Sequence, residues 1–102
     1  MEKAAAIKTS EEAFSLYEKK FKALADQKRL MIMYELTSRG ETCVCDLMDI
    51  FDMSQSKLSY HLKVLKEAGL ILQETKGTWS YYRLNQQEVN KLLSEELCCL
   101  FR

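Results

Sequence analysis

The hydrophobic pattern changes its period near Gly69, and this change constrains the fold more than any other feature. The segment "SQSKLSYHLKVLKEAG" places Leu58, Leu62 and Leu65 at helical spacing after Ser54, a typical N-cap residue. The next segment, "LILQETKGTWSYYRL", alternates apolar and polar side chains on either side of a Lys-Gly pair. Such alternation around a glycine is typical of a β-hairpin. The sequence therefore predicts an amphipathic helix followed at once by a hairpin.

Three further helices are expected before Ser54. Asp26 is a suitable N-cap for "QKRLMIMYELTSR", which Gly40 would end, and Thr42 is expected to cap a short helix. The "TSEE" segment at residues 9–12 has the spacing of a capping box and opens the first helix. The apolar stripe of that first helix consists of Phe14, Tyr17, Phe21 and Leu24.

A last helix is expected to start near Asn85. Its apolar side chains are Val89, Leu92, Leu93, Leu97 and Leu100. The predicted order is therefore α-α-α-α-β-β-α, a mainly α fold with a β-hairpin wing, which is the layout of a winged helix-turn-helix. At 102 residues the chain is expected to form a single domain over residues 1–102.

The distribution of charge is more informative than its sum. The net charge is zero, which argues against a general nucleic-acid coat. Residues 54–83, however, hold five basic and two acidic side chains, a local net charge of +3. No apolar run is long enough for a membrane span or a secretory signal, so we expect a cytoplasmic protein with reduced thiols and no membrane partner.

The helix after Ser54 is the candidate recognition helix for double-stranded DNA. Small polar side chains at its start could contact base edges in the major groove, and Gln55 could pair bidentately with adenine. Lys57 and Lys63 are expected at phosphates, and the hairpin tip along the backbone or minor groove. The candidate DNA-binding residues are Ser54, Gln55, Ser56, Lys57, Ser59, Tyr60, His61, Lys63, Lys76 and Thr78. An ordinary solvated helix face has the same composition, but the following hairpin with its basic tip favours DNA binding.

Two cysteines lie one residue apart in "ETCVCDLMDIF". Cys43 and Cys45 are candidates for core residues, a redox pair or soft-metal ligands. After a cap at Thr42 they would occupy the first helical turn, where the helix dipole lowers thiol pKa values. Residues two apart on an α-helix point roughly 200° away from each other. We therefore expect that both sulfurs can bind one ion only if this turn is distorted.

Several segments together resemble the ArsR/SmtB family of dimeric, metal-responsive winged-helix repressors. They are "LADQKRLMIMYEL", "TCVCDL", "SQSKLSYHLKVLKEAGLI" and "GTWSYYRL". "CVCDL" is similar to the thiol motif of the arsenic-responsive members. The resemblance implies a homodimer, formed through the first and last helices, that binds operator DNA without a cofactor. It also implies that arsenic(III) or antimony(III), bound by cysteine thiolates, releases the DNA, and that the protein is not an enzyme.

The chain departs from this family at Met48. Arsenic-responsive relatives often have a third cysteine there, and a thioether is a poor substitute for a thiolate. Cys98 and Cys99 are the remaining cysteines, and they project about 100° apart on the last helix. The predicted metal ligands are therefore Cys43 and Cys45, with Cys98 and Cys99 as further candidates or as apolar residues of a dimer interface. One site, two sites and a site bridging protomers all stay open.

His61 and the choice of signal leave alternatives open. The only histidine of the chain is expected at the edge of the core, with a DNA phosphate contact as its functional alternative. The last helix has no histidine, which argues against a zinc site of His and Asp there. Cysteines that sense oxidants, or another soft metal such as cadmium, zinc or lead, are the second interpretation. A thiol enzyme that uses Cys43 with His61 is disfavoured because no third orienting group is evident.

Overall fold

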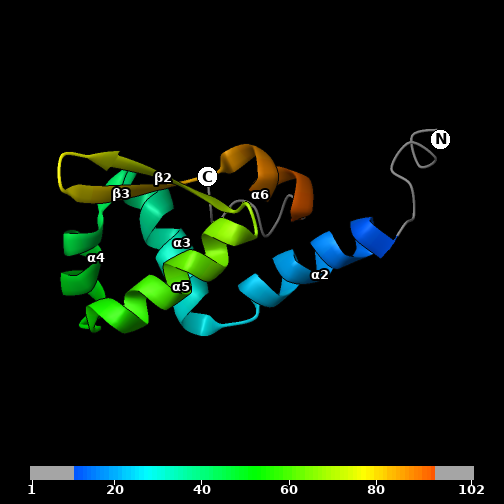
Figure 1. Ribbon diagram of the computed structural model, residues 1–102, viewed down its shortest axis with the longest axis horizontal. Helices are drawn as coiled ribbons and strands as arrows, with labels where there is room; N and C mark the ends of the chain where they lie inside the picture. The colour runs from blue at the N-terminus through cyan, green and yellow to red at the C-terminus, as the bar shows by residue number, and fades with distance from the viewer. Residues whose placement is uncertain (1–10, 94–102) are drawn as a thin grey trace.

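The computed structural model describes residues 11–93 of the chain. Its elements are α2 (Glu11–Leu24), α3 (Gln27–Arg39), β1 (Thr42–Cys43), α4 (Val44–Phe51), α5 (Gln55–Glu67), β2 (Ile71–Lys76), β3 (Trp79–Leu84) and α6 (Gln86–Leu92) (Figure 1). Helices α4 and α5 form the helix-turn-helix, and the β2–β3 hairpin is the wing. The predicted fold class is confirmed. The expected capping box at residues 9–12 and the apolar residues Leu97 and Leu100 lie outside the described residues.

Side-chain caps set the helix boundaries, as their residue types predict. The Asp26 carboxylate accepts hydrogen bonds from the N–H groups of Lys28 and Arg29, at 2.8 and 3.2 Å, at the start of α3. Gly40 ends that helix with a φ of +79°, a conformation that glycine adopts without strain. The Ser54 hydroxyl accepts from the N–H of Lys57 at 3.2 Å and so caps α5. The predicted caps at Asp26 and Ser54 are confirmed.

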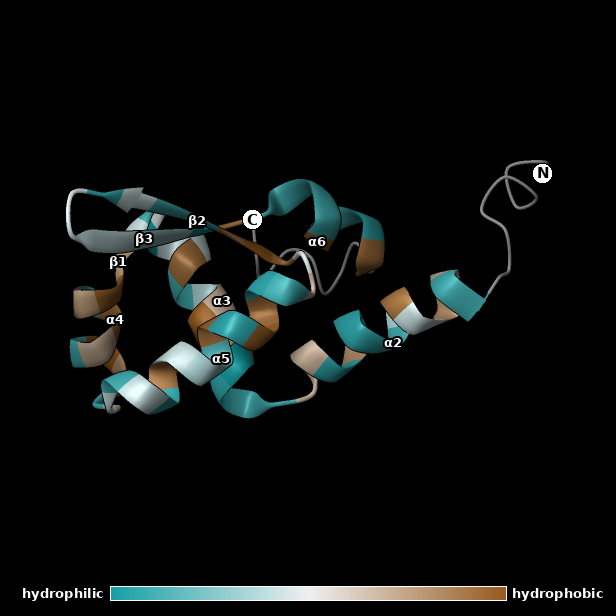
Figure 2. Ribbon diagram, viewed as in Figure 1, coloured by the Kyte–Doolittle hydropathy of each residue, from teal (hydrophilic) through white to brown (hydrophobic). Residues whose placement is uncertain are grey.

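A single apolar core lies between the helix-turn-helix, α3 and the wing. Figure 2 shows hydrophobic and hydrophilic residues side by side along the helices, as expected for amphipathic elements. The largest fully buried side chains are Ile32, Met33, Leu36, Leu47, Leu58, Leu62, Leu65, Leu70, Ile71 and Val89. The three leucines predicted to face inward from α5 all belong to this set. Their burial turns the polar face of α5 toward solvent.

A short strand, β1, was not predicted. It adds to the wing in the order β1-β3-β2, and it pairs Thr42 with Tyr82 and Cys43 with Tyr81. The expected cap at Thr42 is wrong, because this residue is extended and its hydroxyl donates to the carbonyl of Gly40 at 2.8 Å. Helix α4 therefore starts at Val44, with Cys43 as its N-cap.

Asn85 precedes α6 as predicted, but its side chain does not cap the helix. Its amide nitrogen Nδ2 instead donates to the carbonyl of Gly69 at 3.0 Å, and its backbone N–H donates to Leu70 at 2.9 Å. These bonds attach the start of α6 to the loop that follows α5. The buried Val89 adds apolar contact to the same junction.

Helix α2 leads away from the body of the molecule toward the N-terminus (Figure 1). Its predicted apolar stripe is largely exposed: Phe14, Tyr17 and Phe21 are 62, 44 and 54% exposed. Its buried residues are Lys20 and Ala23, toward the end that adjoins α3. Within residues 11–93 no helix is long and apolar enough to cross a membrane.

Candidate thiol site and nucleic-acid interface

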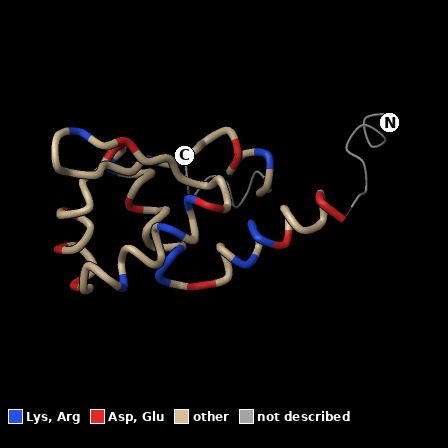
Figure 3. Tube along the Cα trace, in the orientation of Figure 1, with Lys and Arg blue, Asp and Glu red and all other residues tan. Residues whose placement is uncertain are grey.

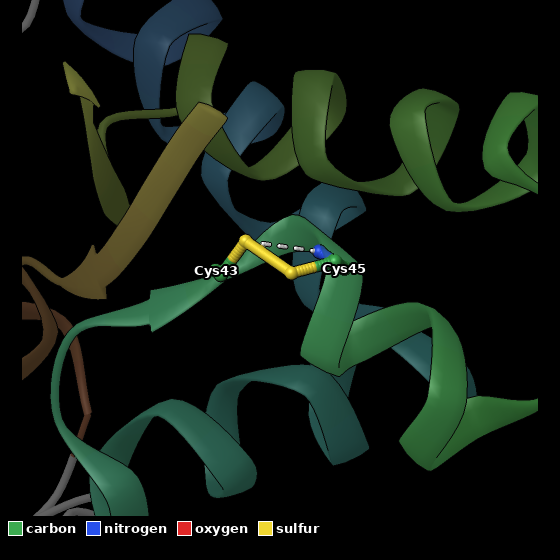
Figure 4. Close-up of a disulfide and its surroundings, with 2 residues drawn as sticks. All are labelled: Cys43 and Cys45. Carbon is green, nitrogen blue, oxygen red and sulfur yellow. Dashed lines mark hydrogen bonds between the residues drawn. A yellow bond between two sulfur atoms is a disulfide. The ribbon is translucent and has the colours of Figure 1, made fainter. Parts of the chain in front are cut away.

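Cys43 and Cys45 form a disulfide in the structure, with their Cα atoms 5.2 Å apart (Figure 4). Cys43 ends β1 in an extended conformation, with φ −70° and ψ 145°, whereas Cys45 is the second residue of α4. The prediction that the two side chains diverge is wrong, because it assumed that both residues are helical. One extended residue before the helix brings the sulfurs together without unwinding its first turn.

Cys43 also caps α4. Its sulfur accepts a hydrogen bond from the N–H of Cys45 at 3.3 Å (Figure 4), the role that a Ser or Asp oxygen usually has. For the reduced thiol, the hydrogen bond with Cys43 and partial burial raise the pKa of Cys45. The expected lowering of thiol pKa values at this helix start is therefore wrong for Cys45, since its sulfur neighbour opposes the helix dipole.

The described residues bring two sulfurs to this site. Met48, at the position of the missing third cysteine, is partly buried and packs against the core. No group of three or more His, Cys, Asp or Glu side chains placed to bind a metal occurs within residues 11–93. Cys98 and Cys99 lie outside the described residues. The geometry thus provides a pair of soft ligands at the junction of β1 and α4.

Apart from His61, the predicted DNA-binding side chains are exposed along α5 and its N-cap or on the wing. Those exposed on α5 are Ser54, Gln55, Ser56, Lys57, Ser59, Tyr60 and Lys63, and those exposed on the wing are Lys76 and Thr78. Figure 3 shows basic residues along α5, both basic and acidic residues on the wing, and acidic residues on α4. The largest exposed apolar group on this face of α5 is Tyr60, 60% exposed. A phosphate backbone placed against α5 and the wing would therefore meet basic and hydrogen-bonding groups.

His61 differs from the other candidates because it is only 6% exposed. Its Nδ1 lies 3.1 Å from Nη1 of Arg29, and since the guanidinium can only donate, Nδ1 accepts this bond. Burial lowers the pKa of His61 below its ordinary value. The interpretation as an edge-of-core residue is confirmed. A phosphate contact stays a prediction that this burial disfavours.

Arg29 itself was missed by sequence reasoning. Its Nε donates to the carbonyl of Ala23 at 2.7 Å, and its Nη2 donates to the carbonyl of Lys22 at 3.2 Å. The guanidinium thus joins the last turn of α2 to His61 on α5. No local pattern could reveal this contact, because Arg29 and His61 are separated by 32 residues.

Lys20 is a second missed residue, buried at 7% exposure. Its Nζ donates to the carbonyl of Ala68, the C-cap of α5, at 2.7 Å. It also lies 3.3 Å from Oε1 of Glu88 on α6, a contact that lowers the pKa of this carboxyl. One ammonium therefore joins α2, the end of α5 and α6.

Lys76, the wing cation, is paired with Glu41, which immediately precedes β1, the strand that contains Cys43 and is called the thiol strand below. Nζ of Lys76 donates to Oε1 of Glu41 at 2.8 Å and lies 5.0 Å from the ring centroid of Tyr81. This hydrogen bond lowers the pKa of Glu41 and raises that of Lys76. Glu41 is 35 residues from Lys76 and immediately precedes β1, so the missed strand concealed this pair as well.

Comparison with known proteins places this architecture in a family. Residues 26–72 match the profile described as "Bacterial regulatory protein, arsR family". The chain is 71% identical over 94 residues to an arsenical resistance operon repressor of Bacillus subtilis (strain 168), with 92% of this chain and 90% of that protein covered. It is 51% identical over 65 residues to an arsenical resistance operon repressor of Escherichia coli (strain K12), with 64% of this chain and 56% of that protein covered.

A solved structure supports the same assignment. It is the solution structure of a homodimeric winged helix-turn-helix DNA-binding domain from Mycobacterium bovis, a possible ArsR-family transcriptional regulator. The TM-score is 0.65 at 28% identity, with 98% of this chain and 78% of that chain covered. Profile, sequence identity and fold agree, and the chain belongs to the ArsR family of bacterial regulatory proteins.

Proposed function

We propose that this regulator is a metalloid-responsive repressor. It binds operator DNA as a homodimer and releases it when arsenite or antimonite binds the thiolates of Cys43 and Cys45. The observation that carries the proposal is the convergence of these two sulfurs at the start of α4, the helix that precedes the recognition helix. The 71% identity to an arsenical resistance operon repressor supports arsenic as the inducer.

The chemistry requires the reduced pair, because the disulfide and the metalloid use the same sulfur atoms. Reduction takes two electrons and two protons and restores two thiols, as expected in the cytoplasm. Arsenous acid then condenses with both thiols, forming two S–As bonds and releasing two water molecules. A third sulfur would come from Cys98, Cys99 or an exogenous thiol.

Release requires that the inducer bind one conformer better than the other. Cys43 is both a ligand and the cap of α4, so a metalloid on its sulfur replaces the hydrogen bond from the N–H of Cys45. A change at the start of α4 would reach α5 through Leu47, which is fully buried in the core that the two helices share. Coupling of this kind typically changes affinity about 5- to 150-fold.

Binding as a dimer requires an interface that the single chain leaves open. The exposed side chains of Phe14, Tyr17 and Phe21 on α2 form an apolar surface suited to a second copy. We assign dimerisation to α2 together with the last helix. In the dimer, both copies of α5 would enter successive major grooves, with Gln55 at base edges, Lys57 and Lys63 at phosphates and the wing tip at the flanking backbone.

The test is an arsenite titration of the reduced protein bound to operator DNA. Arsenite should release the DNA and produce ultraviolet absorption from sulfur-to-arsenic charge transfer. The double variant Cys43→Ser/Cys45→Ser should bind DNA but resist release, and unchanged release would refute the assignment. The matched variant Cys98→Ser/Cys99→Ser retains the α4 pair, so a loss of arsenite affinity with unchanged dimerisation would assign the third ligand to one of these two cysteines.

A second candidate function has a specific observation in its favour. The Cys43–Cys45 disulfide would suit a regulator that responds to oxidants through the same pair. If peroxide releases the operator and arsenite, antimonite and cadmium do not, oxidant sensing replaces metalloid sensing. If cadmium alone releases it, the inducer is a different soft ion.

A further inference from the structure

The thiol strand and the wing are joined at two levels. On the backbone, β1 pairs with β3, and Cys43 lies opposite Tyr81. Among side chains, Glu41 accepts a hydrogen bond from Lys76, whose ammonium also lies over the ring of Tyr81. The strand that faces the sensing cysteine therefore also carries the ring against which the wing cation rests.

We propose that the wing is a second output of the thiol site and that Glu41 is its positioning residue. The Glu41 carboxylate competes with DNA phosphate for the ammonium of Lys76, and inducer binding at Cys43 shifts this competition toward Glu41. The inference rests on the proposed function, and it adds a route from inducer to DNA that bypasses the α4–α5 turn.

The competition follows from the charge and reach of the two groups. The Lys76 side chain is half exposed and that of Glu41 is 29% exposed, so a phosphate can approach the ammonium that the carboxylate holds. An ammonium in contact with phosphate displaces condensed cations, which makes DNA affinity depend on salt. While Glu41 retains Lys76, that contribution is lost. Glu41 therefore acts as an internal substitute for phosphate.

The link to the inducer follows from the position of Cys43. Thr42 and Cys43 are both buried and form the whole of β1, so the strand has little freedom to move independently of β3. Metalloid binding changes the side-chain contacts of Cys43, and the resulting displacement reaches Glu41 two residues earlier and Tyr81 across the ladder. Both groups contact Lys76. The inducer-bound strand thus alters the two contacts that hold the wing cation.

The variant Glu41→Gln tests the proposal, and Glu35→Gln is its matched control. Both variants remove one negative charge with little change in shape. Glu41→Gln loses the ion pair with Lys76 at 2.8 Å, and Glu35→Gln loses the ion pair with Arg39, on the same helix as Glu35, at 2.9 Å. Circular dichroism establishes folding. Operator affinity is then measured across a salt series, with and without saturating arsenite, and arsenite binding is followed separately by absorption.

We expect Glu41→Gln to bind the operator more tightly than Glu35→Gln in the absence of arsenite. Its salt dependence should steepen by about 0.9 in log–log slope per protomer, the value of one phosphate contact. Adding Lys76→Gln should abolish this gain. Arsenite binding by Glu41→Gln, followed by absorption, should equal that of the wild type. If the wing route accounts for about a 5-fold loss of operator affinity, the lower end of typical couplings, the fold-loss that arsenite causes in Glu41→Gln should be roughly one-fifth of the wild-type value.

Other outcomes separate this proposal from the function on which it rests. Equal salt slopes and equal arsenite responses in Glu41→Gln and Glu35→Gln, with wild-type release intact, overturn the wing route and leave the repressor assignment standing. If arsenite fails to release wild-type protein, the proposed function fails. A steeper slope that depends on Lys76 would then retain Glu41 as a competitor for the wing cation but remove its link to the inducer.

Discussion

Replacing Lys20 with methionine should destabilise the protein more than an equivalent change at the surface. The Lys20 ammonium donates to the carbonyl of Ala68 at 2.7 Å, and its side chain is only 9% exposed. A hydrogen bond with a charged partner contributes about 1.5–3 kcal/mol. Its loss leaves the carbonyl that ends α5 without this donor. Glu88 retains Lys91 at 3.4 Å and partial exposure, which limits the additional penalty. We therefore expect Lys20→Met to lower the free energy of unfolding by about 2 kcal/mol.

The assay is urea unfolding at fixed protein concentration, because the stability of a protein that dimerises depends on its concentration. Lys22→Met is the matched control on the same helix: its ion pair with Glu18 is exposed on both sides, so its loss should cost less than about 1 kcal/mol. The two variants should share the wild-type m-value and differ in midpoint. If both midpoints agree within error, the ammonium does not stabilise the α2–α5–α6 junction, and the reasoning from burial is wrong.

Further predictions concern the candidate DNA-binding face of α5 and the buried His61. Gln55→Ala should weaken operator binding by about 1–3 kcal/mol while non-specific binding changes little, as measured by competition with unrelated DNA. Lys57→Ala should weaken both operator binding and non-specific binding, and it should reduce the log–log slope of affinity against salt concentration by about one. Because burial lowers the pKa of His61, the folded state takes up this proton less readily than the unfolded chain, whose histidine titrates near 6.5. Neutral His61 therefore contributes to the free energy of unfolding above about pH 6.5, and this contribution is lost as the pH falls below that value. In a series of unfolding measurements from pH 8 to 5, His61→Gln should remove this part of the loss of stability.

Features encoded over a few neighbouring residues were predictable. Asp26 and Ser54 cap their helices because a short side-chain oxygen reaches backbone N–H groups only two or three residues ahead. The inward leucines of α5 and the hairpin follow from periodicities of 3.6 and 2. The family motif similarly pointed to Cys43 and Cys45, and their sulfurs do meet.

Contacts between distant segments were not predictable. Arg29 with His61, Lys20 with Ala68, and Glu41 with Lys76 each join residues separated by more than 30 positions. A lysine or arginine that makes a long-range contact has the same kind of neighbouring sequence as one that is exposed to solvent. Only the packing of α2 and β1 against the rest of the molecule distinguishes them.

The error at Cys43 had the largest consequence for mechanism. A two-residue strand shows no alternation, so Thr42 resembled an ordinary cap and both cysteines were assigned to the helix. On that assumption an inducer would have to unwind α4 before binding to both sulfurs. With Cys43 in β1, the pair is already converged, and inducer binding need not supply free energy for unwinding. The residue that we propose as a ligand is also a helix cap and a ladder partner of Tyr81, so a change at its sulfur would act on α4 and on the wing together.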